Sequence, residues 1–374
     1  MTRVKPEVEA FARIKVIGVG GSGLNTIDHM IRCKVKSVDF ISVNTDAQNL
    51  HHNTSPRKIH IGKNLTRGLG AGMNPEIGRQ AAEETKEEIQ EAIKGADMVF
   101  LTAGFGGGTG TGALPIIAKT AKEQGALTVA VVTKPFSFEG AQRARIAEEG
   151  LQELKEAVDA MIVIPNDRLF GVIQKETTFA SAFAMCDEVL RQAVEGISDL
   201  ITLPGIINVD FADVKAVMKE AGSALMGTGS SQGEKRAEEA AKRAINSPLL
   251  DTSIDGAKGI LFAIAGGQDM TMVEVQEAAK IITASVDEYA KIIFGAFYDD
   301  RLKKNEIKIT VVASGFPEEI QNTKTHNLFQ GINTENEKEK DKNNNDNKHD
   351  DKKDKSKDWE AIPAFLRRNK KEDD

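Results

Sequence analysis

The sequence predicts an α/β fold with a parallel, helix-covered sheet, a long central helix and a second α/β region. Three observations predict it. Short apolar runs alternate with helical patterns of ten or more residues as far as residue 164, and glycine-rich segments directly follow two of these runs. The pattern then changes after Pro204-Gly205. Alternating strands and helices are typical of a parallel sheet covered by helices.

The first predicted strand, residues 14–17, runs into the glycine-rich segment 18–23. Leu24, Ile27 and Met30 then recur at helical spacing. The later elements of this region are expected in this order: a strand at 38–43, a charged helix ending near 94, a strand at 98–101, a helix at 113–123, a strand at 127–132, a helix at 142–158 and a strand at 161–164.

A long helix is predicted next, at 179–203, with one broad apolar face formed by Phe179, Phe183, Leu190, Val194, Ile197 and Ile201. Pro204-Gly205 ends it. The second α/β region follows, with a mixed sheet, and its elements are expected as helices at 213–220 and 272–282 and strands at 259–265, 292–296 and 307–313.

The last part of the chain has a different composition. From Asn333 to Asp358 there is no aliphatic or aromatic residue, so burial cannot offset the entropy of ordering and we expect disorder. A flexible linker of about forty residues, Glu319 to Asp358, has an r.m.s. span of roughly 35 Å. Beyond it, the only Trp of the chain, Trp359, begins an apolar and basic peptide that is typical of a docking motif.

Six segments follow from these patterns. The boundaries that we expect are 1–12 for a flexible N-terminal segment, 13–178 for the first domain, 179–203 for the central helix, 204–317 for the second α/β domain, 318–358 for the disordered linker and 359–374 for the docking peptide.

Composition excludes several classes of function. The formal net charge is −7, which argues against a duplex-DNA binder and predicts no nucleic-acid partner. No apolar run is long enough to span a bilayer, and the charged N-terminus is no signal peptide, so we expect a cytoplasmic protein without direct membrane insertion. Cys33 and Cys186 lie far apart and suit a reducing compartment, and we interpret both as small buried hydrophobic residues.

Two glycine loops carry the chemistry. Residues 18–23 fit G-x-G-x-x-G between a strand and a helix, where glycines admit a phosphate and the helix start presents free N–H groups. This loop alone also fits a dinucleotide-binding Rossmann fold with Asp39 or Asp46 as the ribose acid. The second loop, 106–112, adds two threonines, and two such loops suit a triphosphate better than one pyrophosphate. Neither loop has a Walker lysine, so backbone amides and Mg²⁺ would offset the phosphate charge.

These residues resemble the FtsZ family, the bacterial relatives of tubulin. Residues 106–112 match the tubulin-type signature, and the resemblance extends from Ile14 to Pro317, through segments 44–48, 70–76, 164–167 and 208–214, and again at 362–366. Ser22 departs from the pattern, where the family more often has glycine. The resemblance implies a tubulin-like GTPase that binds GTP or GDP, with Mg²⁺ held mainly by phosphates and water.

The resemblance also implies which residues contact the nucleotide. Residues 21–25 would hold the α- and β-phosphates, 108–110 the β- and γ-phosphates, and Ala71 with Gly72 would sense the γ-phosphate. Glu139 and Arg143 would contact the ribose and phosphates, although from spacing alone they form an exposed i, i+4 ion pair. The full set expected at the nucleotide is Gly20, Gly21, Ser22, Gly23, Leu24, Asn25, Asn44, Asp46, Ala71, Gly72, Gly104, Gly107, Gly108, Thr109, Gly110, Thr133, Glu139, Arg143, Asn166, Phe183 and Asp187.

Base selection has an argument of its own. Phe183 and Asp187 are four residues apart on the central helix, so one face offers an aromatic ring and a carboxylate together. A carboxylate accepts two N–H bonds from the N1 and N2 edge of guanine, which adenine cannot offer, so GTP is favoured. The simpler interpretation is that Phe183 packs in the core and Asp187 is solvated. Asn166 is a further candidate for the base.

An acidic pair opens the second domain. Asp210 and Asp213, just after Asn208, have the pattern of an N-cap and a first-turn acid, which by itself is a structural feature. A helix of about 25 residues, roughly 37 Å long, separates them from the glycine loops. The resemblance implies that these three residues are catalytic and act on the γ-phosphate of the neighbouring subunit in a head-to-tail filament.

The expected function is therefore a polymerising GTPase of bacterial cell division, assembled at midcell in the septal ring. Its expected partners are further copies of itself, and membrane-tethering and regulatory division proteins that bind residues 359–374. Two alternatives remain, an NAD- or FAD-dependent oxidoreductase and a non-polymerising regulatory relative. The six histidines show no metal-ligand spacing, so no metal site made of protein ligands is expected.

Overall fold

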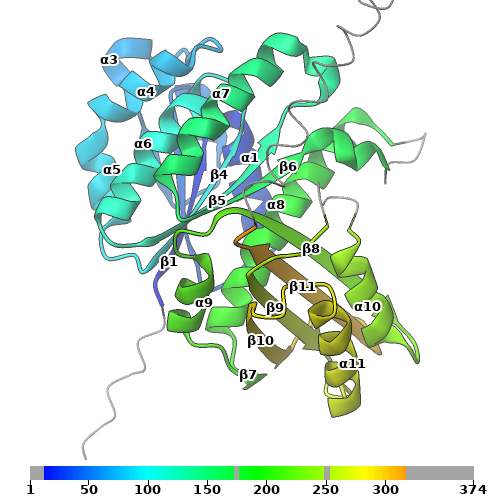
Figure 1. Cartoon of the computed structure of the whole chain (residues 1–374). Coiled ribbons are helices and arrows are strands. Elements are labelled where there is room, and N and C mark those ends of the chain that lie inside the picture. Colours follow the sequence, from blue (N-terminus) through cyan, green and yellow to red (C-terminus); the bar gives the residue numbers. More distant parts are fainter. Residues whose placement is uncertain (1–11, 172–176, 248–252, 317–374) are drawn as a thin grey trace, which may run out of the picture. The chain divides into compact units, whose positions relative to one another are not determined.

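The computed structural model describes residues 12–171, 177–247 and 253–316 (Figure 1). The N-terminal segment up to residue 11, the linker 318–358 and the docking peptide 359–374 lie outside the described residues, so these expectations stay predictions.

In the described residues, eleven strands form one sheet in the order β3-β2-β1-β4-β5-β6-β8-β11-β9-β10-β7. The strands are β1 Ile14–Val19, β2 Asp39–Asn44, β3 Arg57–His60, β4 Met98–Gly104, β5 Leu127–Lys134, β6 Ala160–Pro165, β7 Gly205–Ile207, β8 Gly222–Gln232, β9 Gly259–Gly266, β10 Lys291–Tyr298 and β11 Glu306–Ser314. The helices are α1 Gly20–Arg32, α2 Ala47–His52, α3 Lys63–Thr66, α4 Pro75–Glu84, α5 Lys86–Ile93, α6 Thr109–Glu123, α7 Ala141–Ala157, α8 Phe179–Thr202, α9 Phe211–Met218, α10 Arg236–Ile245 and α11 Met272–Thr283, with short 3₁₀ turns at Ser137–Glu139 and Asn166–Gly171.

The sheet changes character along its width. From β3 to β6 all neighbouring strands are parallel. β6 then pairs in parallel with the start of β8, after which β8, β11 and β9 are antiparallel neighbours. The predicted α/β fold, a parallel sheet followed by a mixed one, is confirmed. The boundaries at residues 178 and 203 stay a prediction, because the two regions share one continuous sheet.

Two apolar cores lie on the two faces of the parallel sheet. One joins α1 and α8 to the strands and continues beneath β9 and β11, and the other lies under α4 to α7. A third core fills the space between α10, α11 and the mixed sheet. Because α8 contributes to a core shared by both regions, it holds the glycine loops in a fixed relation to the residues that follow it.

The predicted apolar face of α8 is buried at Leu190, Val194 and Ile197. Phe183 departs from this pattern, since 37% of it is exposed. A core residue near the start of a long helix would be covered, so this exposure indicates that the first turns of α8 border an open site.

The sequence predicted neither β8 nor α10, which pack against each other. β8 is rich in glycine and serine, a composition that is unusual for a strand interior. The structure gives the reason: a Cβ added at Gly227 would lie 1.9 Å from the carbonyl oxygen of Ala244, and one at Gly229 would lie 2.2 Å from that of Ala240. These glycines let α10 lie directly on the strand, a tertiary requirement that has no local signal.

A similar close contact positions the second glycine loop and gives a stability prediction. A Cβ at Gly112 would lie 1.8 Å from the backbone oxygen of Pro75, so α6 and α4 could not keep their separation. We expect Gly112→Ala to lower the free energy of unfolding by at least about 1–3 kcal/mol, although alanine has the higher helix propensity by about 1 kcal/mol. Urea unfolding without nucleotide measures this. Gly171→Ala, where no described atom lies within 4 Å of the new Cβ, is the control. Equal stability of the two variants would contradict the close packing.

Candidate nucleotide site

A cavity of about 450 Å³ opens at the carboxyl ends of the parallel strands β1, β4 and β5. α1 begins directly after β1, and α6 begins a few residues after β4. The described residues that line it are Val19, Gly20, Gly21, Ser22, Asn25, Gly104, Phe105, Gly107, Gly108, Thr109, Gly110, Thr133, Pro135, Glu139, Arg143, Asn166, Phe183, Cys186 and Asp187. The two glycine loops, which are far apart in sequence, therefore face one cavity.

The phosphate-binding character of the loops follows from their backbone. α1 begins at Gly20, whose φ of +72° is a left-handed conformation that favours glycine, and α6 begins at Thr109. A Cβ at Gly20 would lie 3.1 Å from the backbone nitrogen of Gly110, so the loops nearly touch. Two helix N-termini converge there, each with free N–H groups and a partial positive charge. This arrangement suits an anion with several phosphates.

Ser22 fits beside this loop because of its neighbour. A Cβ at Gly104 would lie 2.8 Å from both Cβ and Oγ of Ser22. Gly104 thus leaves the space in which the serine side chain lies, and the Ser22 hydroxyl lies at the cavity wall.

Six predicted residues are not among the lining. Leu24 is 1% exposed, and the backbone of Gly23 packs closely against the carbonyl oxygen of Thr102, so both support the loop from behind. Asn44 donates to Asn49, while Asp46 accepts from the backbone nitrogen of Asn49 and so caps α2. These contacts hold their loop in shape.

Ala71 and Gly72 are the other two predicted residues that do not line the cavity. Ala71 is buried against the second glycine loop, since a Cβ at Gly108 would lie 2.8 Å from its methyl carbon. Gly72 has a φ of +57°, and no described atom lies within 4 Å of a Cβ added there, so it lies on an open turn. A change in the conformation of the 106–112 loop would therefore displace the segment around Ala71 through this direct contact.

The other end of the cavity has groups suited to a base. Asp187 accepts a hydrogen bond from Thr26 at 2.8 Å, and Phe183 meets Phe136 edge to face at 5.4 Å. Burial raises the pKa of Asp187, and the Thr26 hydrogen bond only partly opposes this. The buried Oδ1 of Asn166 has no hydrogen-bond partner among the described residues. An N–H donor entering here would satisfy that acceptor and stabilise the carboxylate.

Glu139 and Arg143 form the ion pair that their spacing suggests, at 2.5 Å, and both also line the cavity. Glu139 additionally accepts from the backbone nitrogen of Phe136, which fixes it at the rim. The arginine places a positive charge at the mouth, where phosphates would lie. The simple ion pair and the nucleotide role are therefore compatible.

Four residues that line the cavity were not predicted from the sequence. Three of them are Val19, Phe105 and Pro135. Behind the lining, the buried Thr45 hydroxyl lies 2.6 Å from that of Thr109. Cys186 lines the cavity as well, but burial raises the pKa of its thiol to about 12, so it acts as an apolar wall. The sequence signal that could have placed Cys186 at the cavity was its position between Phe183 and Asp187 on the same helix.

The acidic segment lies elsewhere. Asn208, Asp210 and Asp213 are exposed, and none lines the cavity. Asn208 accepts from the backbone nitrogen of Gly205 at 2.7 Å, and among the described residues the Asp210 side chain does not cap α9. The stretch of α8 after Asp187 is about 22 Å long at about 1.5 Å per residue. The acids therefore lie far from the cavity of their own chain. The side chain of Asp210 is also not the N-cap that the simpler interpretation of the sequence suggested.

No helix in the described residues combines the length and apolar character that crossing a membrane requires.

Comparisons with known proteins agree with this architecture. The family model described as the Tubulin/FtsZ family GTPase domain matches residues 13–174, and that of the FtsZ family C-terminal domain matches 222–317. The chain is similar to an empty FtsZ dimer from M. jannaschii, with 48% identity and a TM-score of 0.78, over 82% of this chain and 89% of that one. A mutant FtsZ of that organism matches with the same identity and TM-score, over 82% and 92%. The GTPγS-bound protofilament of CetZ2 from Haloferax volcanii, 21% identical with a TM-score of 0.71 over 88% and 99%, shares the fold.

Proposed function

Because this chain belongs to the tubulin/FtsZ family of GTPases, we propose that it assembles head to tail into filaments and hydrolyses GTP where two subunits meet. In the cell, these filaments would form the septal ring at midcell in the cytoplasm and recruit other division proteins. The observation that carries the proposal is the separation of the cavity from the acidic pair.

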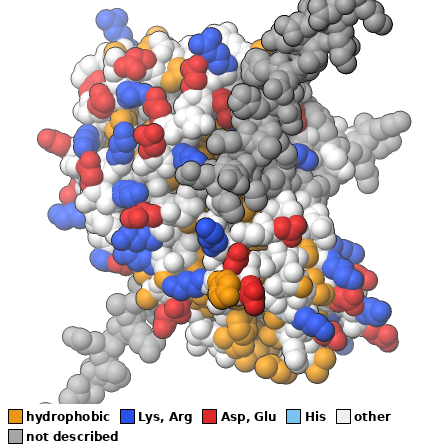
Figure 2. Space-filling view, viewed as in Figure 1, with side chains coloured by type: hydrophobic (Ala, Val, Ile, Leu, Met, Phe, Trp, Pro, Cys, Tyr) orange, Lys and Arg blue, Asp and Glu red, His pale blue; other side chains and the backbone are white. Residues whose placement is uncertain are grey.

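Two different patches of exposed hydrophobic side chains supply the surfaces for such a contact. Figure 2 shows hydrophobic side chains gathered at the end that carries β7, β10 and α11. The exposed large hydrophobic residues there are Ile206, Met272, Val273, Tyr289, Ile292 and Tyr298. Leu65, Leu69 and Met73 are exposed in the segment around Ala71, beside the cavity. Contact between two different patches is heterologous, and it builds an open filament when the rotation between subunits does not close into a ring. The FtsZ of M. jannaschii with 48% identity is itself described as a dimer.

In the assembled state, the cavity of one subunit would face the acidic segment of the next. Asp210 and Asp213 would orient and polarise the attacking water, and Asn208 would help to position it. The loop amides at Gly108 and Gly110 would stabilise the charge that develops on the γ-phosphoryl group. A lone subunit would bind GTP and hydrolyse it slowly, and loss of the γ-phosphate would weaken the contact.

The cavity also fits Mg²⁺ held by phosphates and water. The acidic residues in its described lining are Glu139 and Asp187. Glu139 is paired with Arg143, and Asp187 lies at the base end with Thr26. Thr109 offers a hydroxyl in the phosphate loop. When bound, Mg²⁺ would neutralise part of the phosphate charge.

Assembly-dependent hydrolysis gives a direct test. We expect GTP turnover per molecule to rise steeply above a threshold protein concentration, together with light scattering, and ATP to support neither. Phosphate release measured across a dilution series checks this. Turnover that stays constant in dilute, monomeric protein would contradict hydrolysis at the subunit contact.

The proposed docking peptide, residues 359–374, lies outside the described residues, so its role rests on composition alone. Deleting it should leave GTP turnover within about twofold and abolish recruitment to membranes that carry a tethering partner. Pelleting of wild-type and truncated filaments with such membranes measures this. An equal loss of turnover in the truncated protein would argue against a separate docking role.

A further inference from the structure

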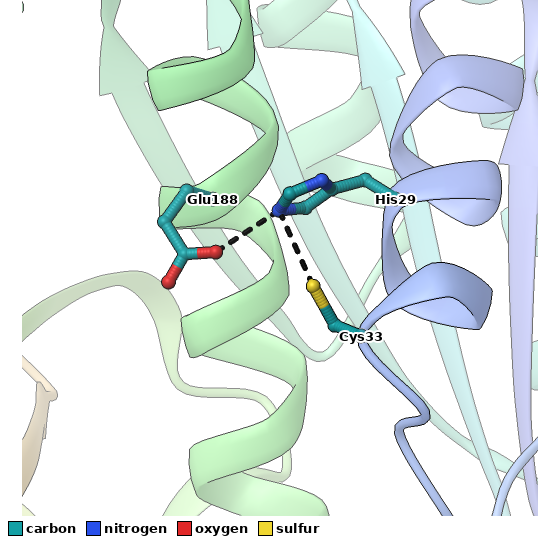
Figure 3. A group of neighbouring side chains, drawn as sticks. All are labelled: His29, Cys33 and Glu188. Carbon is teal, nitrogen blue, oxygen red and sulfur yellow. Dashed lines mark hydrogen bonds and ion pairs between the residues drawn. The ribbon is translucent and has the colours of Figure 1, made fainter.

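A second group of side chains lies at the interface of α1 and α8, outside the cavity lining. Among the described residues, His29, Cys33 and Glu188 are the group of three whose potential ligand atoms all lie within 4.8 Å of one another. Figure 3 shows one imidazole nitrogen of His29 facing both the carboxylate of Glu188 and the sulfur of Cys33. The distances from Nε2 are 3.0 Å to Oε2 of Glu188 and 3.8 Å to Sγ of Cys33. Three different ligand types thus converge on one point.

The geometry is close to that of a tetrahedral metal site. Bond lengths of about 2.0–2.3 Å to Zn²⁺ place neighbouring ligand atoms roughly 3.3–3.7 Å apart. The sulfur is therefore nearly at the required separation, and the carboxylate would move outward by a few tenths of an ångström. His29 and Cys33 are four residues apart on one helix face, so the helix holds both donors on the same side.

The carboxylate is held in place by groups that leave it able to bind a metal. Arg191 donates to both oxygens of Glu188, and Gln192 donates to Oε1. Hydrogen bonds of this kind orient ligating carboxylates in metal sites. The bond from His29 to Oε2 is the contact that a metal ion would replace.

Access and charge also suit a divalent cation. The expectation that both cysteines are buried is wrong for Cys33, which is exposed at the end of α1, so an ion can reach the group. The side chain of His29 is 19% exposed. A thiolate and a carboxylate supply negative charge to the cation, although Glu188 shares its charge with Arg191, and imidazole adds a neutral donor. Mixed nitrogen, sulfur and oxygen ligands favour Zn²⁺ over Mg²⁺ or Ca²⁺, which prefer oxygen alone.

We propose that His29, Cys33 and Glu188 form a Zn²⁺-binding site that joins α1 to α8, with water as the fourth ligand. This site is distinct from the nucleotide cavity and does not depend on the proposed function. It lies close to the Thr26–Asp187 hydrogen bond, so an ion there would clamp the two helices next to the base end of the cavity.

Metal titration of the full-length, nucleotide-free protein tests the proposal. With Co²⁺ as a spectroscopic substitute, we expect thiolate-to-cobalt charge-transfer absorption at one equivalent per chain, which Zn²⁺ abolishes. Cys33→Ser should remove this absorption and weaken Zn²⁺ binding by at least about 10-fold, since even outer-shell changes cost about 10- to 100-fold. Zn²⁺ should raise the Tm of the wild type more than that of Cys33→Ser.

Two further variants separate a metal site from general effects. His29→Gln keeps a donor for Glu188 but loses the imidazole, and it should weaken Zn²⁺ binding as Cys33→Ser does. His52→Gln, on the exposed α2, is the matched control and should bind like the wild type. Far-UV circular dichroism identifies any variant that fails to fold. Wild-type Zn²⁺ affinity in folded Cys33→Ser and His29→Gln, or no thiolate absorption with Co²⁺ in the wild type, would overturn the proposal.

Discussion

Asp213→Asn should form filaments that persist with GTP, because turnover falls by roughly 100-fold or more while nucleotide binding is kept. The side chain is exposed, lies outside the cavity and opens α9, so its loss removes neither a core contact nor a nucleotide contact within its own chain. Filament mass by pelleting, GTP affinity by titration and phosphate release measure the three quantities. Glu234→Gln, an exposed acid before α10, should behave as the wild type.

A mixing experiment makes this prediction sharper. Asp213→Asn keeps an intact nucleotide cavity. A second variant, with a substitution that disables the cavity, keeps both Asp210 and Asp213. If two subunits share the active site, mixed filaments contain contacts where the intact cavity of one variant meets the intact acids of the other. GTP turnover of the mixture should therefore exceed the sum of the two separate activities. Co-pelleting confirms that the two variants assemble together. Co-assembled filaments with no gain in turnover would show that each chain hydrolyses its own nucleotide.

Asp187→Asn should weaken GTP binding by roughly 10²- to 10³-fold and improve the relative binding of XTP. The carboxylate accepts from the N1 and N2 donors of guanine, whereas a carboxamide offers an N–H₂ group that faces the N2 amine. Xanthine has an oxygen at that position and accepts from the carboxamide. Competition binding with GTP, XTP and ATP measures the change. Asp39→Asn, an exposed acid at the start of β2, is the matched control.

The same residue predicts a pH dependence. Burial raises the pKa of the Asp187 carboxyl in the free cavity, and guanine binds the ionised form. Affinity for GTP should therefore be complete above that pKa and fall as the pH drops below it, and this fall should be absent in Asp187→Asn. Identical pH profiles for the two proteins, or unchanged GTP selectivity in the variant, would place the base elsewhere.

Much of the fold could be predicted because its signals are local. The strands β1, β4 and β5 are mostly apolar runs. Glycine-rich segments follow β1 and β4, and the positive φ of Gly20 shows why glycine is needed there. By contrast, β8 looks like a loop in sequence, since Gly227 and Gly229 are required by contact with α10. Close packing of a helix on this strand requires glycines, and it leaves no periodicity in the sequence from which the strand could be predicted.

The site residues divide in the same way, into those that local sequence predicts and those that only tertiary structure places. Phe183 and Asp187 were predictable together because they share a helix face, and the structure places both at the cavity. Asn44 and Asp46 were predicted at the nucleotide from their motif, yet their side chains hold α2 and its loop. A motif identifies which residues matter locally, but only the assembled backbone decides which of them face the cavity.

The sequence by itself determined the parallel α/β fold, the two glycine loops and the family, because these depend on apolar periodicity and on short motifs. The tertiary structure alone decided what lies beside what. It brought both loops to one cavity, placed α8 between that cavity and the acidic pair, and joined His29 to Glu188, 159 positions away. The physical reason is that packing of whole elements sets distances across the chain, and no local pattern encodes them.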